Sequence, residues 1–411
     1  MRYFWLLTGA SALSKIGNTF LYLAIPWVVL SSTGSPFLAA ASLAFQYLPY
    51  LLAPLLGGLI DRFDRRRVYC LAEVLQAGAV AVVPWLLHGG HNLAVMTSLF
   101  LVGLGGVVSG ITSDYGLVPS LAPPDRTAQA FGRYSAVLDV ARFIGPPLAG
   151  LTISAIGANG ALWLDAVTFL ITAAVAMRLP STEAEREQSG QGVRSMLRDG
   201  YREFRRLPGM GRLTLCMSLF NIGSGALQTA LVALGASAWG WSAQGIGLAL
   251  TAGPVASAAG SWLGPRLGTA RSVERRIGGW FAGCAAGAGV LLIPSPVAAI
   301  AGYALICLGT GGMNVATMLY RHEVIPPAYA GRVNAIIRAF GVGALPVSSL
   351  LLGWAVTLPV GWMFLPVVVP VVAALMVWAL APPRGGPRVD ASPSDSSQAS
   401  LHPSTTQEGN P

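Results

Sequence analysis

The chain contains very little charge for its length. Only 10% of its 411 residues are Asp, Glu, Lys or Arg, whereas a soluble protein averages about 25%. Hydrophobic residues make up 54% of the sequence and the mean hydropathy is +0.61. This composition excludes the soluble classes and predicts a membrane protein with many spans. The net charge of +9 does not indicate nucleic-acid binding here, because membrane proteins gather basic residues on the cytoplasmic side, against anionic lipid.

Sequence motifs that carry chemistry are also missing. The chain has no G-x-x-x-x-G-K-[ST], no H-E-x-x-H and no G-x-S-x-G, so we expect no enzymatic activity and no cofactor. Its cysteines are far apart, without a C-x-x-C pair, and are expected to be buried small hydrophobes. His88 and His91 supply too few ligands for a metal site. Gly106 and Gly110, four residues apart in an apolar segment, favour close helix packing over a nucleotide-binding loop.

Long apolar segments fill most of the sequence. They are predicted as spanning helices of about 20 residues or more, at 3–31, 37–60, 67–88, 92–118, 127–155, 159–179, 211–236, 243–265, 275–293, 297–320, 331–357 and 360–381. Every second loop between them lacks Lys and Arg, and each alternate loop carries at least one Arg. The positive-inside rule therefore predicts that both termini are cytoplasmic, in a multi-pass protein of the cell's inner membrane.

The two halves of the chain repeat each other. Pro123-Pro124 recurs as Pro326-Pro327, and Gly150 recurs as Gly353, both at an offset of 203 residues. We therefore predict an all-α membrane protein with twelve transmembrane helices in two pseudo-symmetric six-helix bundles. The expected divisions are an N-terminal bundle over 1–180, a cytoplasmic linker over 181–209, a C-terminal bundle over 210–381 and a disordered cytoplasmic tail over 382–411.

The linker carries a helical pattern of its own. Apolar residues between Val193 and Leu207 follow helical spacing, and arginines fill the remaining faces. This pattern predicts a basic amphipathic helix on the inner leaflet. A solvated linker with some helical propensity is the alternative.

A charged loop joins the second and third predicted helices. It runs from Gly57-Gly58 through Asp61-Arg62 to Arg65-Arg66. The order of small residues, an acid and then arginines resembles the loop of major facilitator superfamily transporters with the pattern G-x-x-x-D-R-x-G-R-R. Asp64 replaces its usual Gly. The resemblance implies a conformational gate in which Asp61 lies beside the N-terminus of the 331–357 helix, whose dipole favours an anion.

A second motif lies in the segment 127–155. Its residues Gly145-Pro146-Pro147-Leu148-Ala149-Gly150 resemble the antiporter motif G-P-x-x-G-G of drug-exporting family members. Proline bends a spanning helix and glycine admits a close neighbour. With Lys15-Ile16-Gly17-Asn18 and Asp165 to Leu170, the motif makes the first half similar to the macrolide-efflux and enterobactin-exporter branch of drug:proton antiporters. That branch often has an acid at the position of Asn18.

Charged residues inside the spans are functional candidates, because they are costly in lipid. Asp139 and Arg142 are spaced for an ion pair within one helix. The pair is a candidate for proton coupling; the alternative is that the two charges only neutralise each other inside the bundle. Lys15, about 18 Å into the first helix, needs water or an acid such as Asp139 or Asp165. Asp114 is a further coupling candidate. For Glu73, we expect a pair with the neighbouring arginines.

Polar residues in other spans are candidates for the wall of a substrate cavity, with core packing as the alternative. These candidates are Lys15, Asn18, Tyr22, Gln46, Asn221, Gln228, Asn314 and Arg338.

Together these features predict a monomeric secondary transporter. It would export a small apolar or amphipathic molecule by alternating access in exchange for protons, with lipids as its surroundings. The alternatives are a proton-coupled importer and a transport-inactive sensor or scaffold.

Overall fold

A computed structural model describes the chain at residues 2–60, 63–123, 127–181, 193–225, 227–264, 266, 273–326, 330–355, 358–359 and 362–380. The secondary structure of these residues is helical, with turns and bends between helices and no strand. The predicted gate residues Asp61 and Arg62, and the tail 382–411, lie outside the described residues.

Elements of the first half follow the predicted segments closely. They are α1 (Arg2–Thr33), α2 (Pro36–Tyr47), the 3-10 turn η1 (Leu48–Leu52), α3 (Ala53–Ile60), α4 (Arg65–His88), α5 (Asn92–Ile111), the π-helical turn η2 (Thr112–Leu117), α6 (Val118–Leu121) and α7 (Thr127–Met177). Within α7, Gly157 has φ 76° and separates two helices, because the left-handed region favours glycine.

Helix α8 (Val193–Arg206) follows, and then the elements of the second half. They are α9 (Met210–Ser224), α10 (Leu227–Ser237), α11 (Ala243–Leu250), α12 (Ala252–Leu263), α13 (Val273–Val290), α14 (Pro296–Val324), α15 (Ala330–Gly343), α16 (Leu345–Ala355) and α17 (Leu365–Leu380). Eight helices of the described chain are long and apolar enough to span a membrane. Dividing α7 at Gly157, and adding α13 and the shorter apolar helices Phe37–Leu52 and Leu365–Leu380, accounts for the twelve predicted segments.

Local sequence explains several helix starts. The side chain of Ser35 accepts a hydrogen bond from the backbone N–H of Leu38, and Pro36 occupies the first turn. Asp64, which departs from the glycine of the loop pattern, caps α4 by accepting from the N–H of Arg66. The carboxylate in this position also favours the positive end of the helix dipole.

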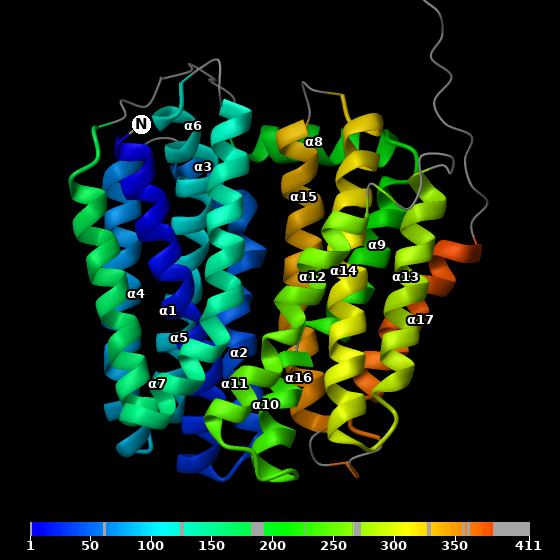
Figure 1. The fold of residues 1–411 in the computed structure, drawn as a ribbon. Coiled ribbons are helices and arrows are strands. Elements are labelled where there is room, and N and C mark those ends of the chain that lie inside the picture. The colour runs from blue at the N-terminus through cyan, green and yellow to red at the C-terminus, as the bar shows by residue number, and fades with distance from the viewer. Residues whose placement is uncertain are drawn as a thin grey trace, which may run out of the picture.

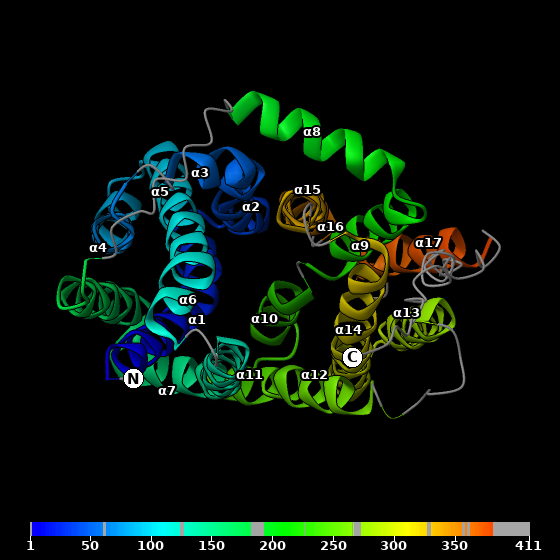
Figure 2. The ribbon, with the colours of Figure 1, turned by 90° about the horizontal axis from the view of Figure 1, so that it is seen from above.

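The helices gather in two groups, one on each side of a central space (Figures 1 and 2). In one group α7 packs along α1 and α4, and in the other α14 packs along α12 and α13. Helix α8 crosses between the groups at the face where α1 begins. We call this the arginine face, because Arg65, Arg66 and Arg67 also begin α4 there; the other end of the bundle is the opposite face.

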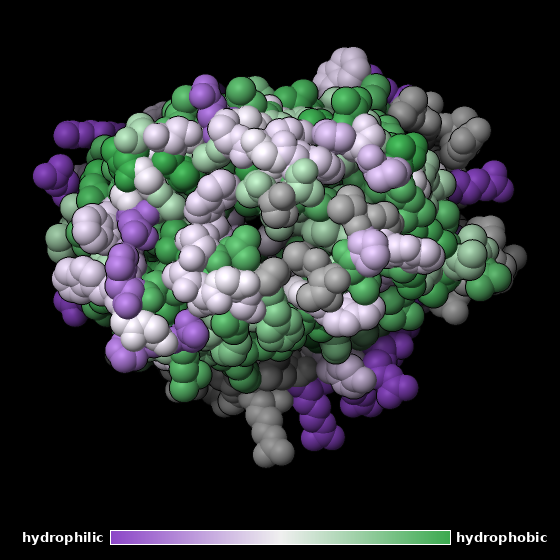
Figure 3. Space-filling model, turned by 90° about the horizontal axis from the view of Figure 1, so that it is seen from below, coloured by the Kyte–Doolittle hydropathy of each residue, from purple (hydrophilic) through white to green (hydrophobic). Residues whose placement is uncertain are grey.

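The two groups touch most closely toward the opposite face. A Cβ atom built on Gly150 of α7 would lie 2.6 Å from the carbonyl oxygen of Ala243 and 3.2 Å from the Cα of Gly247 in α11. Its repeat partner Gly353 of α16 lies against Phe37 and Ala40 of α2. These equivalent glycines let backbones of opposite groups approach, and Figure 3 shows only a small hollow near the middle of this face.

The packing glycines of α5 differ from the prediction. No atom lies within 4 Å of a Cβ built on Gly110, and Gly106 has only ordinary contact with Gln76. Gly103 instead packs against the backbone of Gln46, and Gly105 against Gln76 and the carbonyl oxygen of Ala72. The spacing identified the right helix, but the neighbouring helices decide which of its glycines are buried.

Candidate functional site

Lys15 lies between the two groups of helices. It is exposed although it is in the middle of α1, and the charges that act on it are those of Arg142, Asp114, Glu73 and Arg338. Since these charges come from other helices, including α15 of the second group, the lysine faces the space between the groups. It makes no ion pair with a described residue, so of the two expected surroundings, an open cavity or an acid such as Asp139 or Asp165, the structure favours the first.

The predicted pair within α7 is confirmed. Nη1 of Arg142 donates to Oδ1 of Asp139 at 2.7 Å, with both side chains about two-thirds exposed, at 60% and 64% respectively. An exposed ion pair contributes little to stability. The charge of Arg142 also acts on Lys15, so the pair borders the region between the two groups of helices.

Asp165 is buried completely in the second part of α7. Its Oδ1 accepts from the hydroxyl of Thr168 at 3.4 Å, and its Oδ2 has no hydrogen-bond partner. Gly17 of α1 lies directly against Asp165 and Thr168. A side chain at position 17 would displace this carboxyl, so the Gly in Lys15-Ile16-Gly17-Asn18 has a steric purpose.

Asp114 is half-buried in the π-helical turn η2. Its Oδ1 accepts from the hydroxyls of Ser113 and Tyr134, each at 3.2 Å. This ties the end of α5 to α7. π-helical turns occur frequently at functional sites, and neither this turn nor its hydrogen bonds were visible from the sequence.

Glu73 was assigned wrongly by sequence reasoning. Its side chain is buried among α1, α4 and α5, where it accepts from the hydroxyls of Ser14 and Ser109. Two of the described loop arginines have other partners: Arg66 donates to the carbonyl oxygen of Leu179 at 2.9 Å, and Nε of Arg67 lies 3.9 Å from Oδ2 of Asp64. Proximity along the chain suggested the arginines, but helical geometry turned Glu73 into the bundle.

Three tyrosines adjoin the charged residues. The rings of Tyr22 and Tyr47 stack with centroids 6.1 Å apart, and Tyr50 follows at 6.3 Å from Tyr47. Arg338 and Asp114 act on Tyr50 electrostatically. Only Tyr22 of this cluster was predicted from the sequence. Tyr47 ends α2 and Tyr50 lies in η1, within a segment that was predicted as one continuous helix.

The remaining polar candidates occupy different environments. Gln46 is buried, with its side-chain oxygen unpartnered, so core packing and not the cavity wall describes it. Asn221 donates to the carbonyl oxygen of Gly341, and Asn18 donates to that of Ser14. Gln228 is half-buried, whereas Asn314 and Arg338 are exposed.

The glycine–proline motif forms a junction between helices. Gly145 lies against Thr19 of α1, and the carbonyl oxygen of Pro146 lies against Gly247 of α11, where Gly150 also packs. Pro147, half-buried, lies between them in α7. One short run of α7 therefore contacts the first helix of its own group and a helix of the other group.

Only part of the predicted gate can be located. Gly57 and Gly58 lie in α3, and Arg65 at the start of α4 packs against Gly116 of η2. Asp61 and Arg62 lie outside the described residues.

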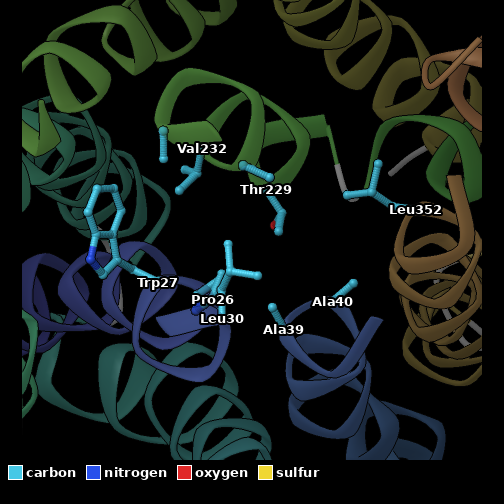
Figure 4. Close-up of a pocket in the computed structure, with 10 residues that line it drawn as sticks. Pro26, Trp27, Leu30, Ala39, Ala40, Thr229, Val232 and Leu352 are labelled. Carbon is cyan, nitrogen blue, oxygen red and sulfur yellow. The ribbon is translucent and has the colours of Figure 1, made fainter. Parts of the chain in front are cut away.

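An apolar cavity of about 120 Å³ lies between the groups toward the opposite face. Figure 4 shows Pro26, Trp27 and Leu30 of α1 facing residues of α2, α10 and α16 across it. Drug-sized ligands need about 300 Å³ or more, so this cavity accommodates only part of one. Sequence inspection did not identify it, because its lining comes from four helices.

A buried polar cluster in the second half was also missed. Nη2 of Arg212 lies 3.5 Å from Oε1 of Glu274, and the guanidinium lies 4.1 Å from the centre of the Trp378 ring. The hydroxyl of Tyr320 donates to the same carboxylate oxygen. The cluster joins α9, α13, α14 and α17 at the arginine face. Among the residues described, no group of three His, Cys, Asp or Glu could hold a metal ion.

Comparisons with known proteins agree with this architecture. The sequence profile of the Major Facilitator Superfamily matches residues 7–345. The chain is 30% identical to the multidrug efflux pump Tap of Mycobacterium tuberculosis over 48% of this chain and 50% of the pump. It is 23% identical to macrolide efflux protein A of Streptococcus pyogenes, over 53% of this chain and 55% of that protein. The aligned region thus spans about half the length of these relatives.

A solved structure shows the same fold over a longer stretch. The nucleoside transporter NupG superposes with a TM-score of 0.74 at 10% identity, covering 92% of this chain and 98% of NupG.

Proposed function

Because the chain belongs to the Major Facilitator Superfamily, we propose that it exports a small apolar or amphipathic molecule by alternating access, in exchange for protons. The cargo class is that of drugs, antibiotics and other secondary metabolites. Members of this family carry small-molecule substrates, and the long apolar helices make this a multi-pass membrane protein.

One stripe of α1 carries the proposal. Lys15, Tyr22, Pro26 and Leu30 are seven, four and four residues apart, so they share one side of the helix. Along it, an exposed cation gives way to stacked tyrosines and then to the apolar cavity. A path that changes from charged to apolar suits an amphipathic molecule, whose two ends need different surroundings.

The two faces of the bundle can be assigned to the two sides of the membrane. The positive-inside rule assigns the arginine face to the cytoplasm, so the Gly150–Gly247 contact closes the outer end. The names of the two efflux relatives support export.

Purified protein in liposomes with an imposed pH step tests this function. With radiolabelled erythromycin and ethidium as probes, we expect one of them to accumulate in the more acidic compartment, since protons leave as substrate enters. Accumulation in the more alkaline compartment would instead support the importer. If the pH step caused neither probe to accumulate in either compartment, proton exchange would be rejected.

Reporter fusions test the orientation. Fusions at Arg65, Gly190, Arg271 and the C-terminal tail should report a cytoplasmic location, and fusions at Ser35, His91 and Trp239 an external one. An external signal at Gly190 would contradict the assignment of the two halves.

A further inference from the structure

The hydroxyl network around Glu73 is unexplained by the features so far assigned. Glu73 is only 1% exposed, eight residues into α4 and therefore about 12 Å along the helix from Arg65. Oε1 accepts from Ser109 of α5, and Oε2 accepts from Ser14 of α1 at 3.5 Å. One turn away on α4, the hydroxyl of Tyr69 shares a hydrogen bond of 3.2 Å with Ser11 of α1. The carboxyl thus bridges three helices.

The charged and titratable groups around Glu73 come from α1, α7 and α4 itself, whereas α5 contributes the hydroxyl of Ser109. These groups are Lys15 from α1, Asp165 from α7, and Tyr69 and Cys70 from α4 itself. Asp114 of η2 acts on Lys15. No described arginine or lysine forms an ion pair with Glu73, and Lys15, next to Ser14 in the chain, faces the inter-group space.

The two protonation states of Glu73 have opposing requirements. Burial in a membrane span strongly disfavours a carboxylate without an ion-pair partner. Two hydroxyl donors and the nearby Lys15 favour that carboxylate. A small movement of α1 that changes the distance to Lys15 would therefore decide whether the proton stays.

Protonation would in turn change how α1 is held. An ionised Glu73 accepts hydrogen bonds from both serines, whereas the protonated carboxyl must donate one hydrogen bond, so one serine has to turn. Because Ser14 precedes Lys15, this change reaches the wall of the transport path within one residue.

We propose that Glu73 is a reversible proton-binding site of the transport cycle, coupled to the position of α1 through Ser14 and Lys15. It would take up a proton when the outer end is open and release it toward the cytoplasm, where Lys15 stabilises the carboxylate left behind. This inference rests on the proposed proton exchange but adds a residue outside the Asp139–Arg142 pair.

Carbodiimide labelling tests proton binding without a substrate. An apolar carbodiimide adds across its C=N bond to a protonated carboxyl and leaves a stable acylurea, which peptide mass spectrometry locates. In the full-length protein in detergent, we expect labelling of Glu73 that falls as the pH rises and is lost in Glu73→Gln. Labelling that is absent at every pH, or independent of pH, would overturn the proposal.

Transport in liposomes supplies the second arm. Glu73→Gln should lose accumulation driven by a pH step and keep probe exchange without a gradient, while Glu323→Gln, an exposed glutamate of α14, should keep both. Retained pH-driven accumulation in Glu73→Gln would refute the inference alone. Loss of both activities in a correctly folded protein would indicate a structural role. If the wild-type protein accumulated no probe in response to the pH step, the proposed function would be refuted instead.

Discussion

Gly150 of α7 and Gly247 of α11 bring the two groups of helices into backbone contact. A Cβ atom built on either would lie within 3.1–3.2 Å of the Cα of the other. Backbone atoms cannot move aside as a flexible side chain can. Any larger residue at these positions must therefore separate the groups where they are closest.

Gly150→Ala should weaken the closure of the opposite face. Overpacking costs about 1–3 kcal/mol, enough to shift an equilibrium between two states roughly fivefold or more. A cysteine introduced at Leu30, which lines the cavity between the groups, should then react faster with an impermeant thiol reagent added outside. Gly132→Ala on the same helix has no neighbour within 4 Å and should label like the parent; equal rates in both variants would argue against the contact as a closure.

Asp139→Asn should abolish proton-driven accumulation and leave passive substrate exchange. Of Asp139 and Asp165, only Asp139 forms a described ion pair with a basic residue one turn away on its own helix, Arg142, and protonation would release that partner. Asp165→Asn should be milder, because an amide can keep the hydrogen bond to Thr168. A pH step across liposomes measures both variants, and a reversed order of the two effects would identify Asp165 as the acid that matters.

Tyr22→Ala should reduce the apparent affinity for a transported probe, since the Tyr22 ring, which stacks on Tyr47, lies on the proposed path and would pack against an aromatic probe such as ethidium. An aromatic pair contributes about 0.5–1.5 kcal/mol, which corresponds to roughly a two- to tenfold weaker affinity in a binding titration. Tyr22→Phe keeps the ring and serves as the control. Equal losses in the two variants would place the effect in the hydroxyl group.

Arg212→Met should destabilise the second half strongly. It leaves Glu274 charged in a site where the side chains of Arg212 and Glu274 are only 14% and 11% exposed, and breaking a buried pair costs about 3–5 kcal/mol. Replacing both residues by Met and Leu should recover most of the loss, because no charge remains buried. Thermal unfolding in detergent measures these differences.

Arg206→Met provides the matched control for that prediction. Arg206 lies 3.9 Å from Glu203 in α8 and its side chain is 61% exposed, so its loss should cost about 0–1 kcal/mol. An unfolding temperature lowered equally by Arg206→Met and Arg212→Met would mean that burial of the second pair does not matter.

Much of the architecture could be predicted from the sequence alone. Hydropathy located the twelve segments, since each helix must present an apolar surface to lipid over a fixed thickness. Spacing along one helix was equally informative: Asp139 and Arg142 stand three residues apart, and that local geometry brings them together in any α-helix. The repeat of Gly150 as Gly353 pointed to equivalent positions before either contact was known.

Only the tertiary structure decided what lies across from each residue. Glu73 follows three arginines in sequence yet bonds to serines 59 and 36 residues away. Lys15 forms no ion pair with Asp139 or Asp165, the two acids considered for it, and Gln46 is buried. Each helix packs against several neighbours at once, and this packing fixes the rotation of the helix about its axis. The rotation in turn determines which residue a given side chain contacts. Hydropathy shows that a residue is in a span, but the span's neighbours determine whether its side chain meets water, lipid or another charge.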